Sequence, residues 1–320
     1  MKPQMPDFGG MPQIIQQDDG GTTFHVKGNV GEITMTRYPV FPGIDLIYND
    51  IHAGISLANL VKDGRRLLEI DHCRDGRMEC RVGKDGFYLA PGDISIHQLG
   101  TSQREELFPT QHYHGITIQI DLDNSPQCLS CFLQDVNVEP ADIAAKFRLE
   151  ENYYYALRQL PAIEHIFSEL YALPQTVKKG YFKVKILELF LFLAGLECTE
   201  DVSEQRGMSG DQVVLAKNVC SYLTEHIEQR ITIAELAEHF AVSASKIKSS
   251  FSGVYGMSVH AYMRGQRMQA AGKLLRTTDR TVLDIAGQFG YDNGSKFANA
   301  FRSVMGVTPA QYRKGSVPTE

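Results

Sequence analysis

The side chains best suited to contacting a ligand lie in the stretch YDNGSKFANAFRSVMG, residues 291–306. Asn can make a bidentate contact with adenine, and Lys suits guanine or a phosphate. Polar and cationic groups that open a helix directly after a Gly-containing break match what the major groove of double-stranded DNA accepts. The stretch therefore indicates DNA recognition, provided that neighbouring helices hold it in place.

A helix pair with a tight turn is expected to position this stretch. Thr281 caps VLDIAGQF, and Asp284 stands three residues later, as a capping box requires. Gly290 ends that helix, and Asn293 with the following Gly opens SKFANAFRSVMG. Thr308 precedes a Pro and so starts a final short helix. The pattern is that of a helix-turn-helix.

An earlier segment repeats the same pattern. Thr232 caps IAELAEHF with Glu235 at the box position, and Ser243 caps ASKIKSSFSGVYG. Most corresponding positions are close to fifty residues apart, and one helix over about residues 258–275 joins the two units. Any pair of helices can imitate one helix-turn-helix, but two tandem copies joined by a helix are a specific signal.

The tandem pattern resembles the DNA-binding domain of the AraC/XylS family of bacterial transcription regulators. The most diagnostic part is IAGQFGYDNGSKFANAFRSVMGVTPAQYR, and the resemblance covers about residues 211–314. Its markers are small, aromatic and turn residues, namely Ala286, Gly290, Phe297, Phe301, Gly306, Pro309 and Tyr312. The resemblance implies that the two units enter adjacent major-groove segments on one face of the DNA, with the joining helix keeping their spacing rigid.

The residues expected to contact DNA face outward at the start of the second helix of each unit or lie on the joining helix. They are Ser245, Lys246, Lys248, Ser249, Arg264, Arg267, Asn293, Ser295, Lys296, Asn299 and Arg302, with Ala244 beside them. Polar side chains would read base edges while cations hold phosphates. The alternative for each is a solvated helix face. Ser249, Ser250 and Asn299 fall where many family members carry Arg, which weakens the expected phosphate contacts.

The apolar positions of the two units are expected to form their cores and to have no other role. They are Ile233, Leu236, Ile247, Phe251, Ile285, Phe289, Phe297 and Phe301.

Charge is divided unevenly along the 320 residues, whose net charge is −6. Residues 211–320 contain 13 Lys and Arg against 9 Asp and Glu, a net of +4, so the first 210 residues, with 19 basic and 29 acidic side chains, carry −10. DNA affinity depends on the local neutralisation of phosphates, not on the total charge. The acidic total therefore does not exclude DNA binding by the C-terminal third.

The chain is expected to be an α+β multidomain protein. Residues 1–29 are predicted to be a mobile N-terminal segment, and residues 30–198 a sensor and dimerisation domain, with a β-barrel or sandwich over about 30–135 and helices over about 139–197. Short alternating runs such as HYHGITIQIDL and turns such as Pro-Gly-Asp indicate the strands. Helical spacing predicts helices over YYYALRQLPAIEHIFSELYAL and YFKVKILELFLFLAGLE. Residues 199–210 are expected to be a linker, and residues 211–314 an all-α domain with two helix-turn-helix units.

The N-terminal part resembles the sensor domains that precede such DNA-binding domains in the family. These are cupin-like β-barrels followed by helices that dimerise. The resemblance implies a homodimer, with the helices between Tyr154 and Leu196 as the expected interface, and a small-molecule effector bound in the barrel.

Candidate effector-binding residues are inward-facing aromatic and His side chains, namely Tyr88, His97, His112 and His114. His112 and His114 are two residues apart on an expected strand and so share a face. With His72 or His97 they could bind a metal, but no carboxylate stands at the spacing of a cupin metal site, so no metal and no other cofactor are predicted. CLSC, residues 128–131, has no second ligand pair, and ordinary packing is its simplest explanation.

These features favour a ligand-responsive transcription regulator, an activator that acts as a dimer on double-stranded DNA and with RNA polymerase, and no enzyme. Two alternatives stay open: a regulator switched by a partner protein without a small ligand, and a cupin-type enzyme fused to a DNA-binding domain. No run of about 18 apolar residues is present. We therefore expect a cytoplasmic protein without a membrane partner.

Overall fold

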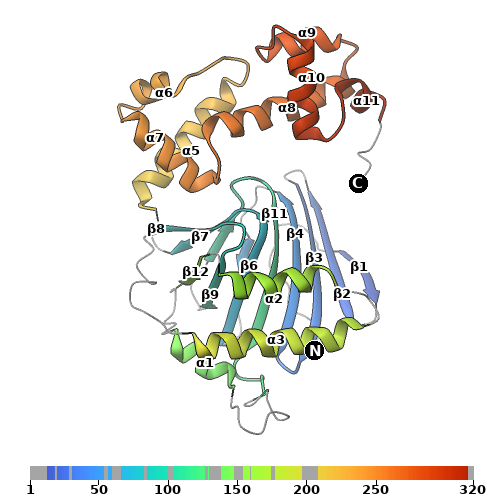
Figure 1. The fold of residues 1–320 in the computed structure, drawn as a ribbon, viewed down its shortest axis with the longest axis vertical. Helices are drawn as coiled ribbons and strands as arrows, with labels where there is room; N and C mark the ends of the chain where they lie inside the picture. Colours follow the sequence, from blue (N-terminus) through green and yellow to red (C-terminus); the bar gives the residue numbers. More distant parts are fainter. Residues whose placement is uncertain are drawn as a thin grey trace. The chain divides into compact units, whose positions relative to one another are not determined.

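The structure is a computed structural model that describes residues 13–18, 20–28, 31–53, 57–59, 66–82, 85–99, 104–126, 129, 138–147, 154–158, 160–173, 177–196 and 208–315 (Figure 1). The chain divides into two compact units, Met1–Ser209 and Gly210–Glu320. Residues 199–207 of the expected linker, and Cys128 and Cys131, lie outside the described residues. Among the described helices, none is both long enough and apolar enough to cross a membrane.

The N-terminal unit contains an eight-stranded and a four-stranded sheet. Its strands are β1 (Gln13–Asp18), β2 (Gly21–Gly28), β3 (Gly31–Phe41), β4 (Ile44–Ala53), β5 (Leu57–Asn59), β6 (Leu67–Gly76), β7 (Met78–Val82), β8 (Asp85–Leu89), β9 (Ile94–Leu99), β10 (Arg104–Leu107), β11 (Tyr113–Asp121) and β12 (Tyr154–Leu157). The large sheet has the order β1-β2-β3-β4-β11-β6-β9-β12, and the small one β5-β10-β7-β8. Every pairing among the described strands is antiparallel.

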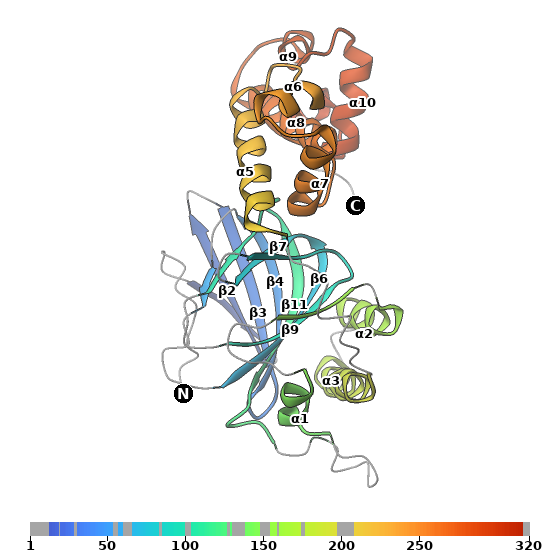
Figure 2. The same cartoon turned by 90° about the vertical axis from the view of Figure 1, so that its left-hand side faces the viewer.

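Three helices cover one face of the large sheet: α1 (Pro140–Lys146), α2 (Pro161–Tyr171) and α3 (Lys178–Gly195) (Figure 2). Pro140 and Pro161 each stand in a first helical turn, where the missing N–H costs nothing. The expected alternation in β11 is confirmed, because Ile116, Ile118 and Ile120 are fully buried in the core that also holds Phe167 of α2 and Phe182 of α3. The opposite face of the large sheet packs in part on the small sheet, through Cys73, Met78, Cys80, Leu89, Phe108 and Tyr113.

Several local expectations in this unit were wrong. Tyr154–Leu157 is a strand that pairs with β9, and the helix begins only at Pro161, because pairing with the sheet edge overrides the helical spacing of this segment. Residues 13–28, expected in a mobile segment, form the hairpin of β1 and β2 at one edge. The cupin-like identity of the unit stays an expectation.

The C-terminal unit is entirely helical in the part that the structure describes. Its helices are α5 (Gly210–Glu225), α6 (Ile233–His239), α7 (Ala244–Tyr255), α8 (Val259–Thr277), α9 (Val282–Gln288), α10 (Gly294–Met305) and α11 (Pro309–Arg313). The long helix α8 joins the pair α6–α7 to the pair α9–α10 (Figure 1). The expected helix order is thereby confirmed for this part of the chain.

Candidate nucleic-acid interface

The two helix pairs of the C-terminal unit have the same lengths, and the first helix of each pair begins with a threonine capping box. α6 and α9 each have 7 residues, and α7 and α10 each have 12. Thr232 and Thr281 form full capping boxes with Glu235 and Asp284. Each box lowers the pKa of its carboxyl group, chiefly through a hydrogen bond from the threonine: the backbone N–H of Thr232 to Glu235, and the side chain of Thr281 to Asp284.

The turn between the two helices of each pair contains one residue in the left-handed region. It is Ala241 in the first pair, with φ 51°, and Gly290 in the second, with φ 78°. In both turns a backbone N–H reaches back to the first helix, from Val242 to the Ala237 carbonyl and from Tyr291 to the Ala286 carbonyl, each at 3.0 Å. The second turn is one residue longer, because α10 is capped by Asn293 and α7 by Ser243.

Each pair has its own apolar core, and that of the second pair packs on α8. Leu236, Ile247 and Phe251 are fully buried in the first pair. In the second, Ile285, Phe289, Phe297 and Phe301 pack with Met268, Ala271 and Leu275 of α8. The core expectation is therefore confirmed except at Ile233, which is only half-buried because it begins the short helix α6.

The second helices of the two pairs, α7 and α10, present matching polar residues at their N-terminal turns. Ser245 and Lys246 of α7 occupy the positions that Ser295 and Lys296 occupy in α10, two and three residues after the cap. All of the expected DNA contacts are exposed except Arg267, which is half-buried. Among the described residues, none of Lys246, Lys248, Lys296, Arg264 and Arg302 is placed in an ion pair. Their charges therefore stay available for phosphates.

Two of the expected contacts also have structural tasks. The Asn293 side-chain oxygen caps α10 by accepting the backbone N–H groups of Ser295 at 2.8 Å and Lys296 at 3.3 Å. Its amide nitrogen is the part left for a base. Arg267 donates to the backbone carbonyls of Ile227 at 2.8 Å and Gln229 at 2.7 Å, and burial lowers the pKa of its guanidinium.

The family positions that lack Arg differ in exposure. Ser249 and Asn299 are exposed, and the Ser249 hydroxyl donates to the Lys246 carbonyl at 3.2 Å. Ser250 is fully buried, so this position faces the core and not the surface on which phosphate contacts were expected.

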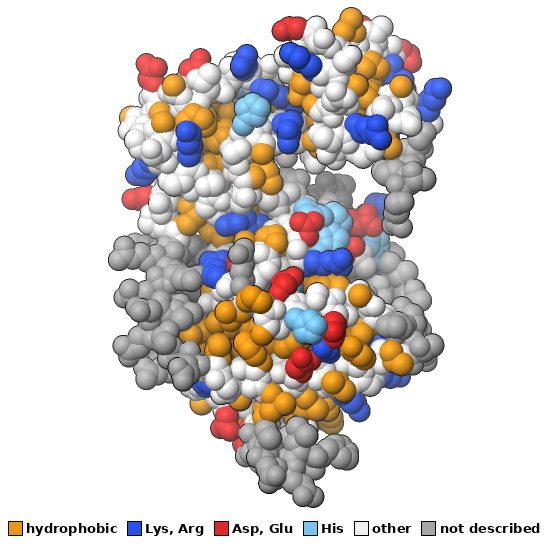
Figure 3. Space-filling model, in the orientation of Figure 1, with side chains coloured by type: hydrophobic (Ala, Val, Ile, Leu, Met, Phe, Trp, Pro, Cys, Tyr) orange, Lys and Arg blue, Asp and Glu red, His pale blue; other side chains and the backbone are white. Residues whose placement is uncertain are grey.

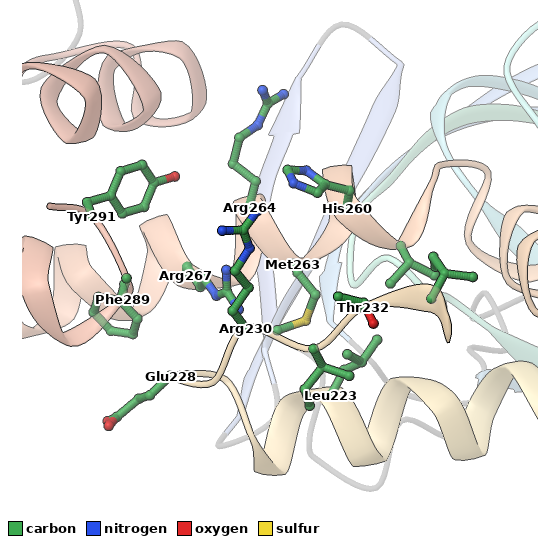
Figure 4. Close-up of a pocket in the computed structure, with 14 residues that line it drawn as sticks. Leu223, Glu228, Arg230, Thr232, His260, Met263, Arg264, Arg267, Phe289 and Tyr291 are labelled. Atoms are coloured by element: carbon green, nitrogen blue, oxygen red, sulfur yellow. The ribbon is translucent and has the colours of Figure 1, made fainter. Parts of the chain in front are cut away.

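A cleft of about 470 Å³ lies between the two helix pairs against α8. Arg230, Arg264 and Arg267 line it next to one another, between Phe289 and Tyr291 on one side and Thr232 on the other, and His260 lies close by (Figure 4). Phe289 and Tyr291 enter from the turn of the second pair, and Met263 forms part of the floor. Arg230 and His260 were not singled out from the sequence, although Arg230 stands only two residues before the Thr232 cap. The cleft combines positive charge with enough space for a phosphate group.

The four candidate effector-binding residues of the N-terminal unit lie on or beside three different strands. Tyr88 is buried on β8 in the small sheet. His97 is buried on the large sheet, where its Nε2 lies 3.0 Å from Glu69 Oε2 and its Nδ1 3.5 Å from Asp71 Oδ2. Only His112 and His114 come together, at the start of β11, with ring centroids 4.5 Å apart.

His72 is separated from the other candidates for metal binding. Its ring stacks on Phe167 of α2 at 4.3 Å, and its Nε2 lies 3.1 Å from Glu164. Burial lowers its pKa. The groupings of His112 and His114 with His72 or His97 considered from the sequence are therefore not formed. The third residue beside them is His52 of β4, which the sequence did not point to.

Comparisons with known proteins find relatives of the C-terminal unit. The family model described as "Helix-turn-helix domain" matches residues 236–315. "Transcriptional regulator Rob" of Salmonella typhimurium is 31% identical over 106 residues, 33% of this chain and 37% of that protein. The "Melibiose operon regulatory protein" of Escherichia coli is 32% identical over 93 residues, 29% of this chain and 31% of that protein. The chain thus spans about a third of the length of these curated relatives.

A solved structure, the C-terminal domain of AraT, a response regulator from Geobacillus stearothermophilus, is 30% identical to this chain. It covers 33% of this chain and 88% of its own, with a TM-score of 0.31. The family model and the curated relatives carry the assignment, and they confirm the expectation drawn from the tandem motifs. The helix-turn-helix domain of this chain belongs to the AraC/XylS family.

Proposed function

We propose that the chain is a sequence-specific regulator of transcription that binds double-stranded DNA through α7 and α10. The observation that carries the proposal is the repeat itself: two helix pairs of equal length, each opened by a threonine capping box, joined by α8. Their recognition helices expose the same Ser-Lys pair at the first turn. A repeated reading element on a rigid connector suits two successive major-groove segments.

In this proposal the polar residues of the recognition helices read bases. Asn299 and Ser249 occupy equivalent positions on α10 and α7, and Lys246 and Lys296 stand one turn nearer to the N-terminus of each helix. Asn would favour adenine, whereas Lys would contact guanine or a phosphate. Different residues at the equivalent positions would let the two helices read different sequences.

The cleft between the helix pairs would receive a phosphate of the DNA backbone. Arg264 is exposed and Arg230 faces the same cleft, whereas Arg267 is already bound to two backbone carbonyls. Arg230 and Arg264 are therefore the better phosphate ligands. Each phosphate contact contributes about one unit to the slope of log affinity against log salt concentration.

The test is a DNA-binding titration of the full chain at several salt concentrations. Arg264→Ala should weaken binding to all sequences to a similar extent and reduce the salt slope by about one unit. Asn299→Ala should leave the slope unchanged and relax base preference at one position by about 1–3 kcal/mol. Lys183→Ala, an exposed cation on α3 of the other unit, serves as the control. Equal effects of Asn299→Ala on all sequences would contradict its role in reading bases.

A homodimer formed through α3 is the second part of the proposal. Val177, Val184 and Leu191 follow one another at intervals of seven residues, and their exposed fractions are 50%, 58% and 37%. Large apolar side chains at this interval form one stripe along a helix, which suits pairing with a second helix. A second copy of the chain would cover the stripe and double the number of DNA contacts.

Sedimentation of the full chain tests the dimer. Val184→Glu should convert a dimer to a monomer, whereas Ser168→Glu, which adds the same charge at an exposed position of α2, should not. A wild-type chain that is monomeric at micromolar concentration would exclude the α3 dimer.

The N-terminal unit would act as the regulatory part, which senses a small molecule and makes the chain an activator that works with RNA polymerase. Tyr88, His97 and the pair of His112 and His114 lie on different strands, so the proposal names no common set of lining residues. A regulator switched by a partner protein is the alternative. No described feature favours an enzyme.

A further inference from the structure

Three His side chains gather at one end of the large sheet of the N-terminal unit. His52 lies near the end of β4, His112 directly before β11, and His114 within β11. One ligand nitrogen of each lies within 4.8 Å of the others. In Figure 3, His side chains lie together beside acidic side chains on the surface of the N-terminal unit.

The strand register explains why these residues meet. β11 and β4 pair with Tyr113 opposite Ile51 and His114 opposite Asp50. Residues two apart on a strand share a face, so His52 joins Asp50 on one strand and His112 joins His114 on the next. A bulge between β11 and β6 skips one residue of β6 and brings Asp75 opposite His114. Bulges of this kind re-aim side chains.

The backbone at His112 is held firmly. Its carbonyl accepts from the Thr110 hydroxyl at 2.9 Å and from the Arg77 N–H at 3.3 Å. The preceding Gln111 has φ 55°, a left-handed conformation that a residue with a side chain adopts at a cost. A β-carbon at Gly76 would meet the His112 carbonyl oxygen at 2.0 Å, so the close approach requires glycine there.

The nitrogens of two rings are already arranged as in a metal site. His112 Nε2 lies 2.9 Å from Asp75 Oδ2, and His52 Nε2 lies 2.9 Å from Asp50 Oδ1. Their Nδ1 atoms face each other at 3.4 Å. Two nitrogens bound to one tetrahedral metal at about 2.0–2.1 Å are separated by roughly 3.3 Å. A carboxylate on the far nitrogen of each ligating His is the arrangement that fixes the tautomer and orients the ring.

We propose that His52, His112 and His114 bind a divalent transition metal ion such as Zn²⁺, with Asp75 and Asp50 positioning the rings. Three imidazoles suit Zn²⁺, Ni²⁺ or Cu²⁺ and leave a fourth coordination position open. Asp50 Oδ1 also lies 3.4 Å from His114 Nε2, so this carboxylate stands beside two of the three rings.

The site is accessible to an ion from solution. The side chains of His112 and His114 are each 35% exposed and that of His52 is 52% exposed, so binding requires no opening of the core. A bound ion would link β4 to β11 at the end of the sheet. Such a link stabilises the folded chain by RT ln(1 + [L]/Kd), where [L] is the concentration of the free ion.

The experiment uses full-length protein without an affinity tag, stripped with a chelator and titrated with ZnCl₂ by calorimetry. Co²⁺ serves as a second probe, because its visible absorption reports tetrahedral nitrogen ligation. We expect one ion per chain. His112→Gln and His52→Gln should each weaken binding by at least about 100-fold, and Asp75→Asn by about 10–100-fold.

His165→Gln is the matched control. His165 is an exposed His on α2 with a carboxylate neighbour, Glu169, at 3.4 Å, and no other described His lies in a metal-type cluster with it. Its replacement should leave zinc binding unchanged. Failure of the wild-type chain to bind zinc at 100-fold molar excess, or undiminished binding by folded His52→Gln and His112→Gln chains, would overturn the proposal. Circular dichroism of each variant shows whether it is folded.

Discussion

Replacing Gly290 by Ala should weaken the second helix-turn-helix through backbone conformation alone. Gly290 has φ 78°, and a β-carbon built there meets no atom within 4 Å. No clash therefore contributes. Placing an L-residue in the left-handed region costs about 1–2 kcal/mol. Ala also lowers the conformational entropy of the unfolded chain, which offsets about 0.4–1 kcal/mol of this cost. The net loss in the free energy of unfolding is about 1 kcal/mol.

Two further substitutions test the sign of this reasoning. Gly287 lies inside α9, where an added β-carbon also meets nothing within 4 Å, so Gly287→Ala should stabilise the domain by about 1 kcal/mol through helix propensity. Ala241 occupies the equivalent left-handed position of the first turn, with φ 51°. Ala241→Gly should therefore be neutral to stabilising by about 1 kcal/mol, the reverse of Gly290→Ala.

The assay is thermal unfolding of the fragment 210–320, which corresponds to one compact unit. A change of 1 kcal/mol shifts the Tm of a domain of this size by about 4–8 °C. Hydrogen exchange of the α9 and α10 amides in the full chain checks the same ranking in the intact protein. If Gly290→Ala and Gly287→Ala shift the Tm in the same direction, the turn conformation assigned to Gly290 is refuted.

Three further predictions concern the same domain. Lys296→Ala should weaken DNA binding and reduce its salt slope by about one unit, measured by titration at several salt concentrations; an unchanged slope would remove Lys296 from the phosphate contacts. Arg267→Met should destabilise the domain by about 2 kcal/mol in urea unfolding, because the carbonyls of Ile227 and Gln229 lose a charged donor; a change near zero would contradict this tethering role. The pKa values of Glu235 and Asp284 are lower in the folded chain, so their caps stabilise the folded chain above about pH 4, and this contribution is lost as the pH falls through the folded pKa values. Glu235→Gln should therefore make the decrease in Tm on acidification smaller. An unchanged decrease in Tm would contradict the role of the capping box.

The C-terminal domain could be predicted from the sequence because its signals are local. A threonine with a carboxylate three residues later defines a helix start without any knowledge of the rest of the chain, and both boxes are present. The same local reasoning could not show that Ser250 faces the core or that Arg267 is bound to carbonyls 38 and 40 residues away. Those outcomes depend on tertiary packing.

The N-terminal unit was predicted less well because its order is set by pairing between distant strands. The apolar residues that follow Tyr154–Leu157 have helical spacing, which led us to extend the helix back over this segment. The segment instead pairs with β9 at the edge of the large sheet. His52 could not be grouped with His112 from the sequence, since 60 residues separate them and only the β4–β11 register brings them together. The alternation of β11 could be predicted from the sequence because the isoleucines on one face of the strand all enter the same apolar core.

The central claim is tested most directly by sequencing the genomic DNA fragments that the purified full-length chain retains, with the fragment 210–320 run in parallel. The account predicts one shared motif long enough for two adjacent major-groove contacts, and two copies of it in the fragments retained by the full-length dimer. The absence of any enriched motif with either protein would contradict sequence-specific recognition by α7 and α10.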